Sequence, residues 1–510
     1  MSSLRGIYLL FQFLLLPLIA VNQEFIGLVS DNFSGNEAAR INPSLQNLQK
    51  NFISVRALSV GAFAQNDFAY IPHEDITLFG VIFGNDTLPL YDRDWVRYKY
   101  YQNENLKSAG FNAYIGGPAI MLSKGDNTFS VHSAFRSYLS APNIPYEIPV
   151  FSTELQGYSP LHHINFNNEP FQIAFLSWNE IGFSWSTKIY QDYANRLDAG
   201  ITFNGVFAVA GTFINVNKMN YVVIDGHTIH VFDMDLDAGF SLPVNYDNNL
   251  IGPQGSPIRG KGLGIDIGFT YTRSARSTHN DKWQRRLSLP YEDYRWRIGI
   301  SILDIGRVNF NRLAEVHSGY GENVLWGRSD TLETLNIHQL MRDISLVLMG
   351  DTNASYKGNS FKMGLPTALS LQFDYHLRSN YYLGSFWVHP LALEKYYVRR
   401  SAQLGLIPRF ESEWFGASLP LSLYDYKIPR IGAALRFGPL TMGTERLGVL
   451  LGLMDINGLD FYMSLNFGFN RKADFRNPVS GGCITDDNFR QRRIKHMRWP
   501  EISRKKLSRR

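Results

Sequence analysis

Three carboxylates at alternate positions have the residue type and spacing of the first ligands of a calcium-binding EF-hand loop. They lie in the stretch VFDMDLDAGFSL (231–242) and are Asp233, Asp235 and Asp237. Such a loop also needs a turning glycine at its sixth position and a carboxylate at its twelfth, where this chain has Ala238 and Val244. The calcium interpretation therefore fails, and we predict neither a metal site nor a cofactor.

The residues between the aspartates are apolar, which is the two-residue period of a β-strand. The apolar stripe comprises Phe232, Met234, Leu236, Ala238, Phe240 and Leu242. On the other face the aspartates would stand about 7 Å apart, from the rise of a strand. A hydrated polar lumen held by salt bridges is one interpretation, and a cation-selective or divalent-ion site is the other.

The same alternation recurs in segments of about ten residues, including IGFSWSTKIY (181–190), LGIDIGFTYT (263–272) and LSLQFDYHLR (369–378). We find roughly 14 such segments between residues 52 and 469, and a tilted strand needs about 9–11 residues to cross a bilayer. Tyrosines near the segment ends predict an interfacial aromatic girdle: Tyr138, Tyr190, Tyr271 and Tyr294. A soluble extracellular β protein remains the alternative.

The sequence therefore predicts an all-β fold, a transmembrane antiparallel up-and-down β-barrel of about 14 strands (12–16). We divide the chain into a signal peptide (1–20), an N-terminal periplasmic or lumenal plug segment (21–51), the barrel (52–469) and a basic, disordered periplasmic tail (470–510). A long loop region (305–365) interrupts the barrel, and helical spacing within it predicts a short helix at 335–349. That helix would pack on a loop or the barrel mouth, or act as a plug or gate.

Charged residues on the polar faces of these strands are the candidates for lining the lumen. They are Asp233, Asp235, Asp237, Asp266, Lys188, Arg295, Arg297, Asp374 and Arg378. Because unpaired aspartates repel one another, the four cations of this set are the expected partners of the three alternate aspartates.

The chain offers little that could do covalent chemistry. It has no G-x-S-x-G, Walker A, Rossmann glycine pattern, H-E-x-x-H or Cys/His zinc spacing, and Cys483 is its single cysteine. We therefore expect no catalytic residues and no enzymatic activity.

The tail carries 13 Lys and Arg residues against 4 Asp and Glu residues, counted over 470–510. Its candidates for binding a partner are Arg490, Arg492, Arg493, Lys495, Arg498, Arg504, Lys505 and Lys506. In the periplasm such a tail would meet a periplasmic protein, cell-wall polymer or anionic lipid, and the compartment argues against nucleic acid. A solvated spacer is the plainer interpretation.

Several stretches resemble an uncharacterised family of outer-membrane β-barrels from Bacteroidota, among them RIGISILDIGRVNF (297–310), LPTALSLQFDYHLRSNYYLGSFW (365–387) and GLDFYMSLNFGF (458–469). The early Asn42-Pro43 pair is similar to the opening of fatty-acid-transporter-like barrels, whose N-terminal segment plugs the lumen. The resemblance implies a barrel in the bacterial outer membrane, surrounded by its lipid.

For function we expect a passive, porin-like channel, a transporter or a binding protein for a small ligand that could be hydrophobic. The alternative is a structural or docking subunit of a cell-envelope machine, in which the barrel anchors and the tail recruits a partner.

Overall fold

The computed structural model describes residues 25–82, 84, 99–101, 103–154, 158–192, 194–250, 255–274, 294–327 and 336–469. The predicted signal peptide and the whole predicted basic tail, with its eight candidate residues, lie outside this part of the chain. Among the described residues, no helix is both long enough and apolar enough to cross a membrane.

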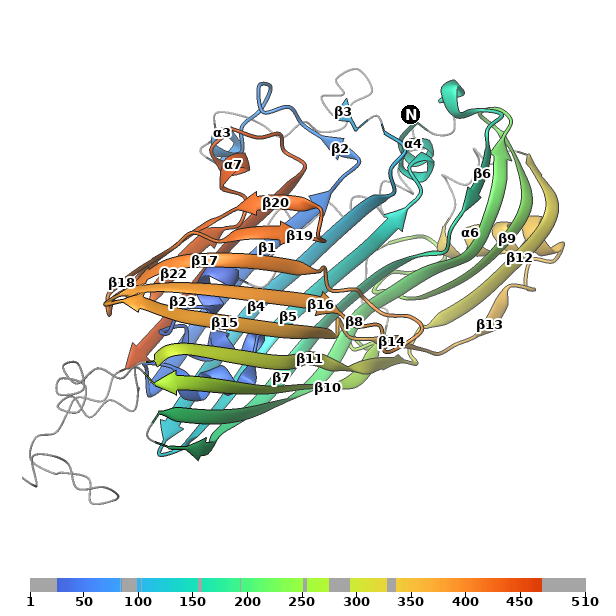
Figure 1. Ribbon diagram of the computed structural model, residues 1–510. Helices are drawn as coiled ribbons and strands as arrows, with labels where there is room; N and C mark the ends of the chain where they lie inside the picture. Colours follow the sequence, from blue (N-terminus) through green and yellow to red (C-terminus); the bar gives the residue numbers. More distant parts are fainter. Residues whose placement is uncertain are drawn as a thin grey trace, which may run out of the picture.

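Long antiparallel strands form a closed barrel, because β1 is hydrogen-bonded on one side to β4 and on the other to β23 (Figure 1). The barrel has 14 strands, as predicted, and several consist of collinear segments. The barrel strands are β1 (Ile53–Asn66), β4 (Lys107–Lys124), β5 (Asn127–Ile144), β7 (Phe171–Gln191), β8 (Asn195–Val223), β10 (Gly260–Ser274), β11 (Tyr294–Phe310), β14 (Phe361–Gly364), β15 (Ala368–Arg378), β16 (Tyr381–Pro390), β17 (Gln403–Glu411), β18 (Phe415–Ser418), β19 (Leu421–Tyr424), β20 (Ile428–Ile431), β21 (Ala433–Phe437), β22 (Leu440–Thr444) and β23 (Gly458–Phe469).

The two faces of the strands differ as their alternation predicts. On β7, Ile181, Phe183 and Trp185 point outward and are 60%, 45% and 42% exposed, whereas Ser184 and Ser186 between them are buried on the inner face. An apolar outer face and a polar inner face are the arrangement of a membrane barrel and the inverse of a soluble one.

The segment that follows residue 24 lies inside the barrel rather than on its surface. It contains α2 (Ile26–Val29) and two 3-10 turns, η1 (Gly35–Arg40) and η2 (Pro43–Leu48), and most of its residues are buried. Figure 1 shows this blue segment enclosed at the end of the barrel where β23 ends. We call residues 25–51 the plug, this end of the barrel the plug end, and the opposite end the distal end.

One side of the barrel extends far beyond the rest at the distal end. The 29-residue strand β8 pairs with β10 over its first half and with β9 (Thr228–Ser241) over its second half. β12 (Glu315–Gly327) continues the line of β11 and pairs with β9, and β13 (Tyr356–Gly358) pairs with β12. Residues 305–365, predicted as a long loop, thus contain β12, β13 and β14. β12 and β13 form because the antiparallel pairing of the sheet continues beyond the barrel into the extension.

The helix predicted at 335–349 is α6 (Ile337–Met349), which begins after a capping box at Asn336 and ends at Gly350 with φ 76°. It packs on the outer face of the extension. Ile344 and Leu348 belong to the same apolar cluster as Met234, and Ile337 and Met341 pack against the cluster of Phe240. The apolar stripe around the three aspartates, predicted to face lipid, is therefore covered in large part by α6. The remaining elements are β2 (Ala69–Tyr70), β3 (Lys99–Tyr100), β6 (Asn165–Asn168), α3 (Leu78–Ile82), α4 (Glu147–Glu154), η3 (Ser159–Leu161) and α7 (Leu447–Leu450).

The predicted aromatic girdle is wrong for two of its four tyrosines. Tyr190 is 54% exposed, but Tyr138 and Tyr294 are only 6% and 1% exposed. A register irregularity near the start of β11, where Ser274 pairs with Tyr294, turns the Tyr294 side chain inward. A single extra residue in a strand is enough to reverse the face that its neighbours occupy.

Candidate functional site

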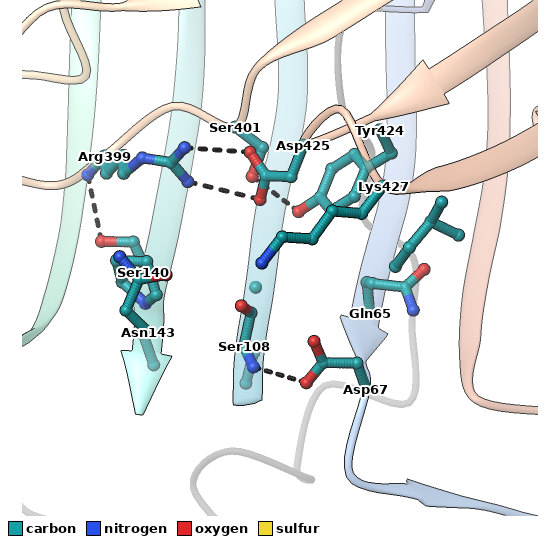
Figure 2. A pocket seen from close by; sticks show the side chains of 15 residues that line it. Gln65, Asp67, Ser108, Ser140, Asn143, Arg399, Ser401, Tyr424, Asp425 and Lys427 are labelled. Atoms are coloured by element: carbon teal, nitrogen blue, oxygen red, sulfur yellow. Dashed lines mark hydrogen bonds and ion pairs between the residues drawn. The ribbon is translucent and has the colours of Figure 1, made fainter. Parts of the chain in front are cut away.

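The interior of the barrel is divided into layers, and the first, at the distal end, is a polar pocket of about 120 Å³ (Figure 2). The ends of β1, β4 and β5, the turn between β19 and β20, and part of the β16–β17 connection form its walls. Its polar side chains are Gln65, Asp67, Ser108, Ser140, Asn143, Arg399, Ser401, Tyr424, Asp425 and Lys427.

The connection between β16 and β17, residues 391–402, lies across the lumen below this pocket, and we call it the strap. Backbone hydrogen bonds join it to β14: Gly364 N donates to Tyr396 O at 2.8 Å, and Val398 N donates to Gly364 O at 3.3 Å. The ring of Tyr396 stacks on Phe213 of β8 with the ring centroids 3.8 Å apart. The strap therefore bridges two walls of the barrel.

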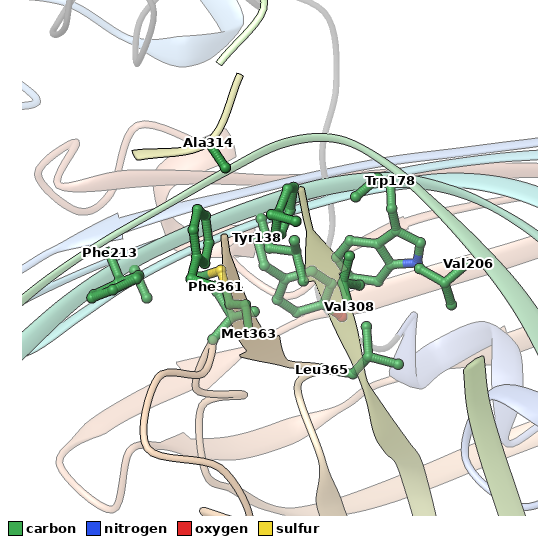
Figure 3. Packing of buried hydrophobic residues seen from close by; sticks show 14 residues of the cluster. Tyr138, Trp178, Val206, Phe213, Val308, Ala314, Phe361, Met363 and Leu365 are labelled. Atoms are coloured by element: carbon green, nitrogen blue, oxygen red, sulfur yellow. The ribbon is translucent and has the colours of Figure 1, made fainter. Parts of the chain in front are cut away.

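Beneath the strap lies a closely packed apolar layer, contributed by strands that face one another across the lumen (Figure 3). Its buried members are Tyr138, Ala174, Leu176, Trp178, Val206, Ala208, Phe213, Val308, Phe310, Ala314, Phe361, Met363, Leu365 and Val398. Aromatic rings stack within it, as for Phe310 and Phe361 at 4.8 Å. We call this set the apolar layer.

A layer of buried charges separates the apolar layer from the plug, around a cavity of about 50 Å³. Arg136 donates to both carboxylate oxygens of Asp304, at 2.7 and 2.8 Å, and also to Glu180 at 3.3 Å. Arg400 of the strap donates to the same Asp304 carboxylate. The strap is thus tied both to the apolar layer and to the ion pairs below it.

The plug is anchored where the Asn42-Pro43 pair meets the barrel wall. Asn42 donates through Nδ2 to Gln372 Oε1 at 2.9 Å and to Phe269 O at 3.2 Å. A Cβ added to Gly268 would lie 2.1 Å from Asn42 Oδ1, and one added to Gly200 would lie 2.4 Å from Ser44 N. Only glycine at these wall positions leaves room for the turn.

Ion pairs join the plug to the wall around its circumference. Arg56 donates to Glu37 at 3.1 Å, Arg436 donates to Asp31 at 2.7 Å, and Lys50 lies 3.6 Å from Glu411. Breaking a buried ion pair is costly, because the charge that remains has neither water nor a partner. The plug is therefore held in place by several independent contacts.

Three of the predicted lumen residues lie on the inner face next to these layers. Arg297 and Asp374 form an ion pair of 2.9 Å, and Arg409 lies 2.5 Å from the same carboxylate. Asp266 is 9% exposed and accepts hydrogen bonds from Asn204 Nδ2 and from the Asp304 backbone N–H.

Three others lie at the edges of the barrel. Lys188 pairs with Asp126 at the plug-end rim at 2.5 Å. Arg295 and Arg378 are exposed, and their placement in the lumen is wrong. Register irregularities beside each of them, in β11 and in the β15–β16 pair, change the face that they occupy.

The three alternate aspartates lie on the distal extension rather than at the centre of the barrel. Asp233 pairs with Lys218, Asp237 accepts from Lys395 Nζ at 2.9 Å and from Tyr396 Oη at 3.1 Å, and Asp235 lies half-buried between them. The cations predicted as their partners are wrong, because Lys218 and Lys395 come from β8 and the strap.

Asp304, Arg400 and Arg409, which carry the buried charge layers, were not among the predicted lumen residues. The break in alternation at Leu303-Asp304 was a usable signal, since two adjacent inward side chains require a bulge; Asp304 has φ 53° there. The strap residues had no such signal, because nothing local shows that a loop folds inward.

A serine, a histidine and a glutamate on the distal extension have the order of a nucleophile, base and acid. Ser355 Oγ lies 3.0 Å from His317 Nδ1, and His317 Nε2 lies 3.3 Å from Glu315 Oε2. However, Ser355 is only 4% exposed beside α6, and Glu315 also bonds to His338 at 2.9 Å. We assign this chain of hydrogen bonds to the docking of α6.

Residues 43–445 match a family model whose description is a family of unknown function (DUF5723). No curated protein matches the chain.

Solved structures with a similar course of the chain include two toluene transporters and a FadL homologue. The toluene transporter TbuX of Ralstonia pickettii has 9% identity and a TM-score of 0.38, over 86% of this chain and 94% of that one. The toluene transporter TodX of Pseudomonas putida has 10% identity and a TM-score of 0.28, over 88% and 96%. A FadL homologue of Pseudomonas aeruginosa has 11% identity and a TM-score of 0.27, over 89% and 99%. Since these TM-scores are below 0.5, the likeness does not indicate a ligand for this chain.

Proposed function

The chain belongs to the family of unknown function DUF5723, and we propose that it is a bacterial outer-membrane barrel that carries a small hydrophobic ligand through its lumen without enzymatic change. The observation that carries the proposal is the apolar layer, which lies between the polar distal pocket and the layer of buried charges.

The outer surface supports a place in a lipid bilayer. On β7 the outward apolar side chains run from Ile181 to Ile189, both more than half exposed. Eight residues at the rise of a strand span roughly 26 Å along the strand, or about 20 Å across the membrane at the usual tilt, which accounts for most of the apolar band of about 25 Å on transmembrane barrels. Because the strands are even in number, β1 begins and β23 ends at the plug end, so the plug end faces the periplasm and the distal end faces the medium.

The interior supports a hydrophobic ligand. A lumen that served only water-soluble solutes would be lined by polar groups from end to end, as in porins. Here fourteen buried side chains pack against one another between the strap and the charged layer. A hydrophobic solute gains roughly 25 cal/mol for each Å² of apolar surface that it removes from water, so this layer is where it would bind once the strap has moved and opened the packing.

Two elements control access to the apolar layer. The strap covers it from the distal end and contributes Val398 to it, while the plug closes the barrel below the charged layer. Entry from the medium then requires the strap to move, and release requires a path past the plug. The charged layer between them opposes passive leakage of the ligand.

Uptake of labelled benzene by cells that express the full chain tests this function. The change Val398→Asp places an uncompensated carboxylate in the apolar layer. The control Leu393→Asp introduces the same carboxylate on the strap at a side chain that is 60% exposed. We expect uptake above that of empty-vector cells, lost in Val398→Asp and kept in Leu393→Asp. Circular dichroism of both purified variants establishes that the barrel has formed. Uptake that is equal in both variants, or absent from the unmodified chain, contradicts the proposal.

A further inference from the structure

The distal pocket of Figure 2 differs in chemistry from the apolar layer below it. Ten of its fifteen lining residues carry a charged group, a hydroxyl or an amide, and the lining is drawn from five separate parts of the chain. A ligand selected by the apolar layer would gain nothing from such walls, because apolar groups do not replace the water that solvates them. The pocket therefore calls for a polar ligand of its own.

Some polar groups of the pocket wall already have hydrogen-bond or ion-pair partners within the wall. Arg399 forms two close contacts with the Asp425 carboxylate, at 3.1 and 3.3 Å, and Asp425 also accepts from Ala402 N at 2.9 Å. Ser401 Oγ and Tyr424 Oη lie 2.6 Å apart. These groups neutralise one another and make a rigid frame rather than a source of net charge.

Two opposite charges that face the pocket are not joined to each other. Asp67 accepts from Ser108 N at 2.5 Å, and Lys427 is exposed at the start of β20. Within the part of the chain that the structure describes, the two form no ion pair, although both side chains line the pocket. In Figure 2 they extend into the same space from neighbouring walls. Burial raises the pKa of Asp67, although the Ser108 N–H and the nearby charges of Lys107 and Lys427 act in the opposite direction.

One polar lining residue, Gln65, is held from behind by two buried arginines. Gln65, which lines the pocket, accepts through Oε1 from Arg430 Nη2 at 2.9 Å and from Arg446 Nη2. Among the described residues, Arg430 Nε and Nη1 and Arg446 Nη1 have no acceptor, although the two side chains are 5% and 7% exposed. Neither arginine lines the pocket, but through Gln65 they fix a polar group in its wall.

We propose that this pocket is a binding site for a small zwitterion, with an ammonium group bound by Asp67 and a carboxylate group bound by Lys427. A free α-amino acid of modest size has both groups on the same carbon and fits a cavity of about 120 Å³. The ligand would supply an ion-pair partner to Asp67 and another to Lys427. This site is independent of hydrophobic uptake, since it shares no residue with the apolar layer.

Calorimetric titration of the purified full chain with glycine, and separately with acetate and methylammonium, tests the site. Glycine carries both charges and each of the other probes carries one. Because a hydrogen bond to a charged group contributes about 1.5–3 kcal/mol, glycine should bind at least about tenfold more tightly than either half.

Three variants test which group of the ligand binds Asp67 and which binds Lys427. In Asp67→Asn, glycine should fall to the affinity of acetate, and in Lys427→Met it should fall to that of methylammonium. The control Lys362→Met removes an exposed lysine on β14, outside the pocket, and should leave glycine binding unchanged. The proposal is overturned if glycine binds the unmodified chain no better than its halves, or if Lys362→Met weakens glycine as much as Lys427→Met.

Discussion

Among single residues, two glycines of the wall, which have no side chain, decide whether the plug fits against it. Gly200 and Gly268 are paired across β8 and β10, so they form one rung of the ladder against which the Asn42 turn rests. A Cβ on Gly200 would meet plug backbone at 2.4 Å, which no side-chain rotation can relieve. A single methyl group at this rung should therefore move the plug.

We predict that Gly200→Ala dislodges the plug from the wall and raises ion conductance in planar bilayers above that of the unmodified chain. Gly205→Ala is the matched control on the same strand, since the nearest atom to its added Cβ is 3.7 Å away. Conductance of Gly200→Ala that stays at the level of Gly205→Ala would show that the glycine rung does not position the plug.

The charged residues of the lumen were predictable from the sequence only where the strand that carries them is regular. Arg297 and Asp374 were identified because each stands on the polar face of a regular strand, and a regular strand preserves that face along its length. Arg295 was misplaced because one irregularity in pairing reverses every side chain beyond it. Such irregularities depend on the partner strand, which a local pattern does not contain.

At the scale of elements, α6 shows why a helix can be predicted while its role cannot. Its apolar spacing, the capping box at Asn336 and Gly350 are all local signals, and the helix forms where they indicate. Its packing surface is supplied by β9 and β12, of which β12 lay in a predicted loop. The helix was therefore predictable and its partner was not.

The docking of α6 should depend on pH through His338. Partial burial alone would lower the pKa of His338, but hydrogen bonds to the Asp247 and Glu315 carboxylates, at 2.8 and 2.9 Å, raise it above its ordinary value of 6.5. A raised pKa in the folded state means that the stabilisation is complete below about 6.5 and is lost as the pH rises through the folded value.

Hydrogen-exchange protection of residues 337–349, corrected for the intrinsic pH dependence of exchange, measures this effect. We expect protection to fall between pH 6 and pH 9 in the unmodified chain and to be independent of pH in His338→Gln. A fall of the same size in the variant would assign the pH dependence to other groups.

At the scale of the whole molecule, the barrel itself was the most predictable feature. Alternation over about ten residues fixes strands and faces at once, and lipid requires a closed sheet because an open edge leaves backbone groups unpaired. The layers inside were not predictable, since the strap, the plug and β14 meet only after the barrel has closed. The apolar layer joins Tyr138 to Val398, 260 positions apart, through the fold alone.

The central claim is that a hydrophobic ligand reaches the apolar layer from the medium when the strap moves, and a reversible lock tests it most directly. A Cβ on Gly364 would lie 3.0 Å from Tyr397 Cβ, about 0.5 Å short of the Cβ separation in a disulfide, so with a small shift of the strap the pair Gly364→Cys and Tyr397→Cys should form a disulfide between strap and wall. Cys483→Ser removes the native thiol. We would measure benzene uptake by the same cells before and after reduction. The account predicts little uptake with the disulfide formed and recovery on reduction. Equal uptake in both states, with the disulfide verified by mass spectrometry, would contradict it.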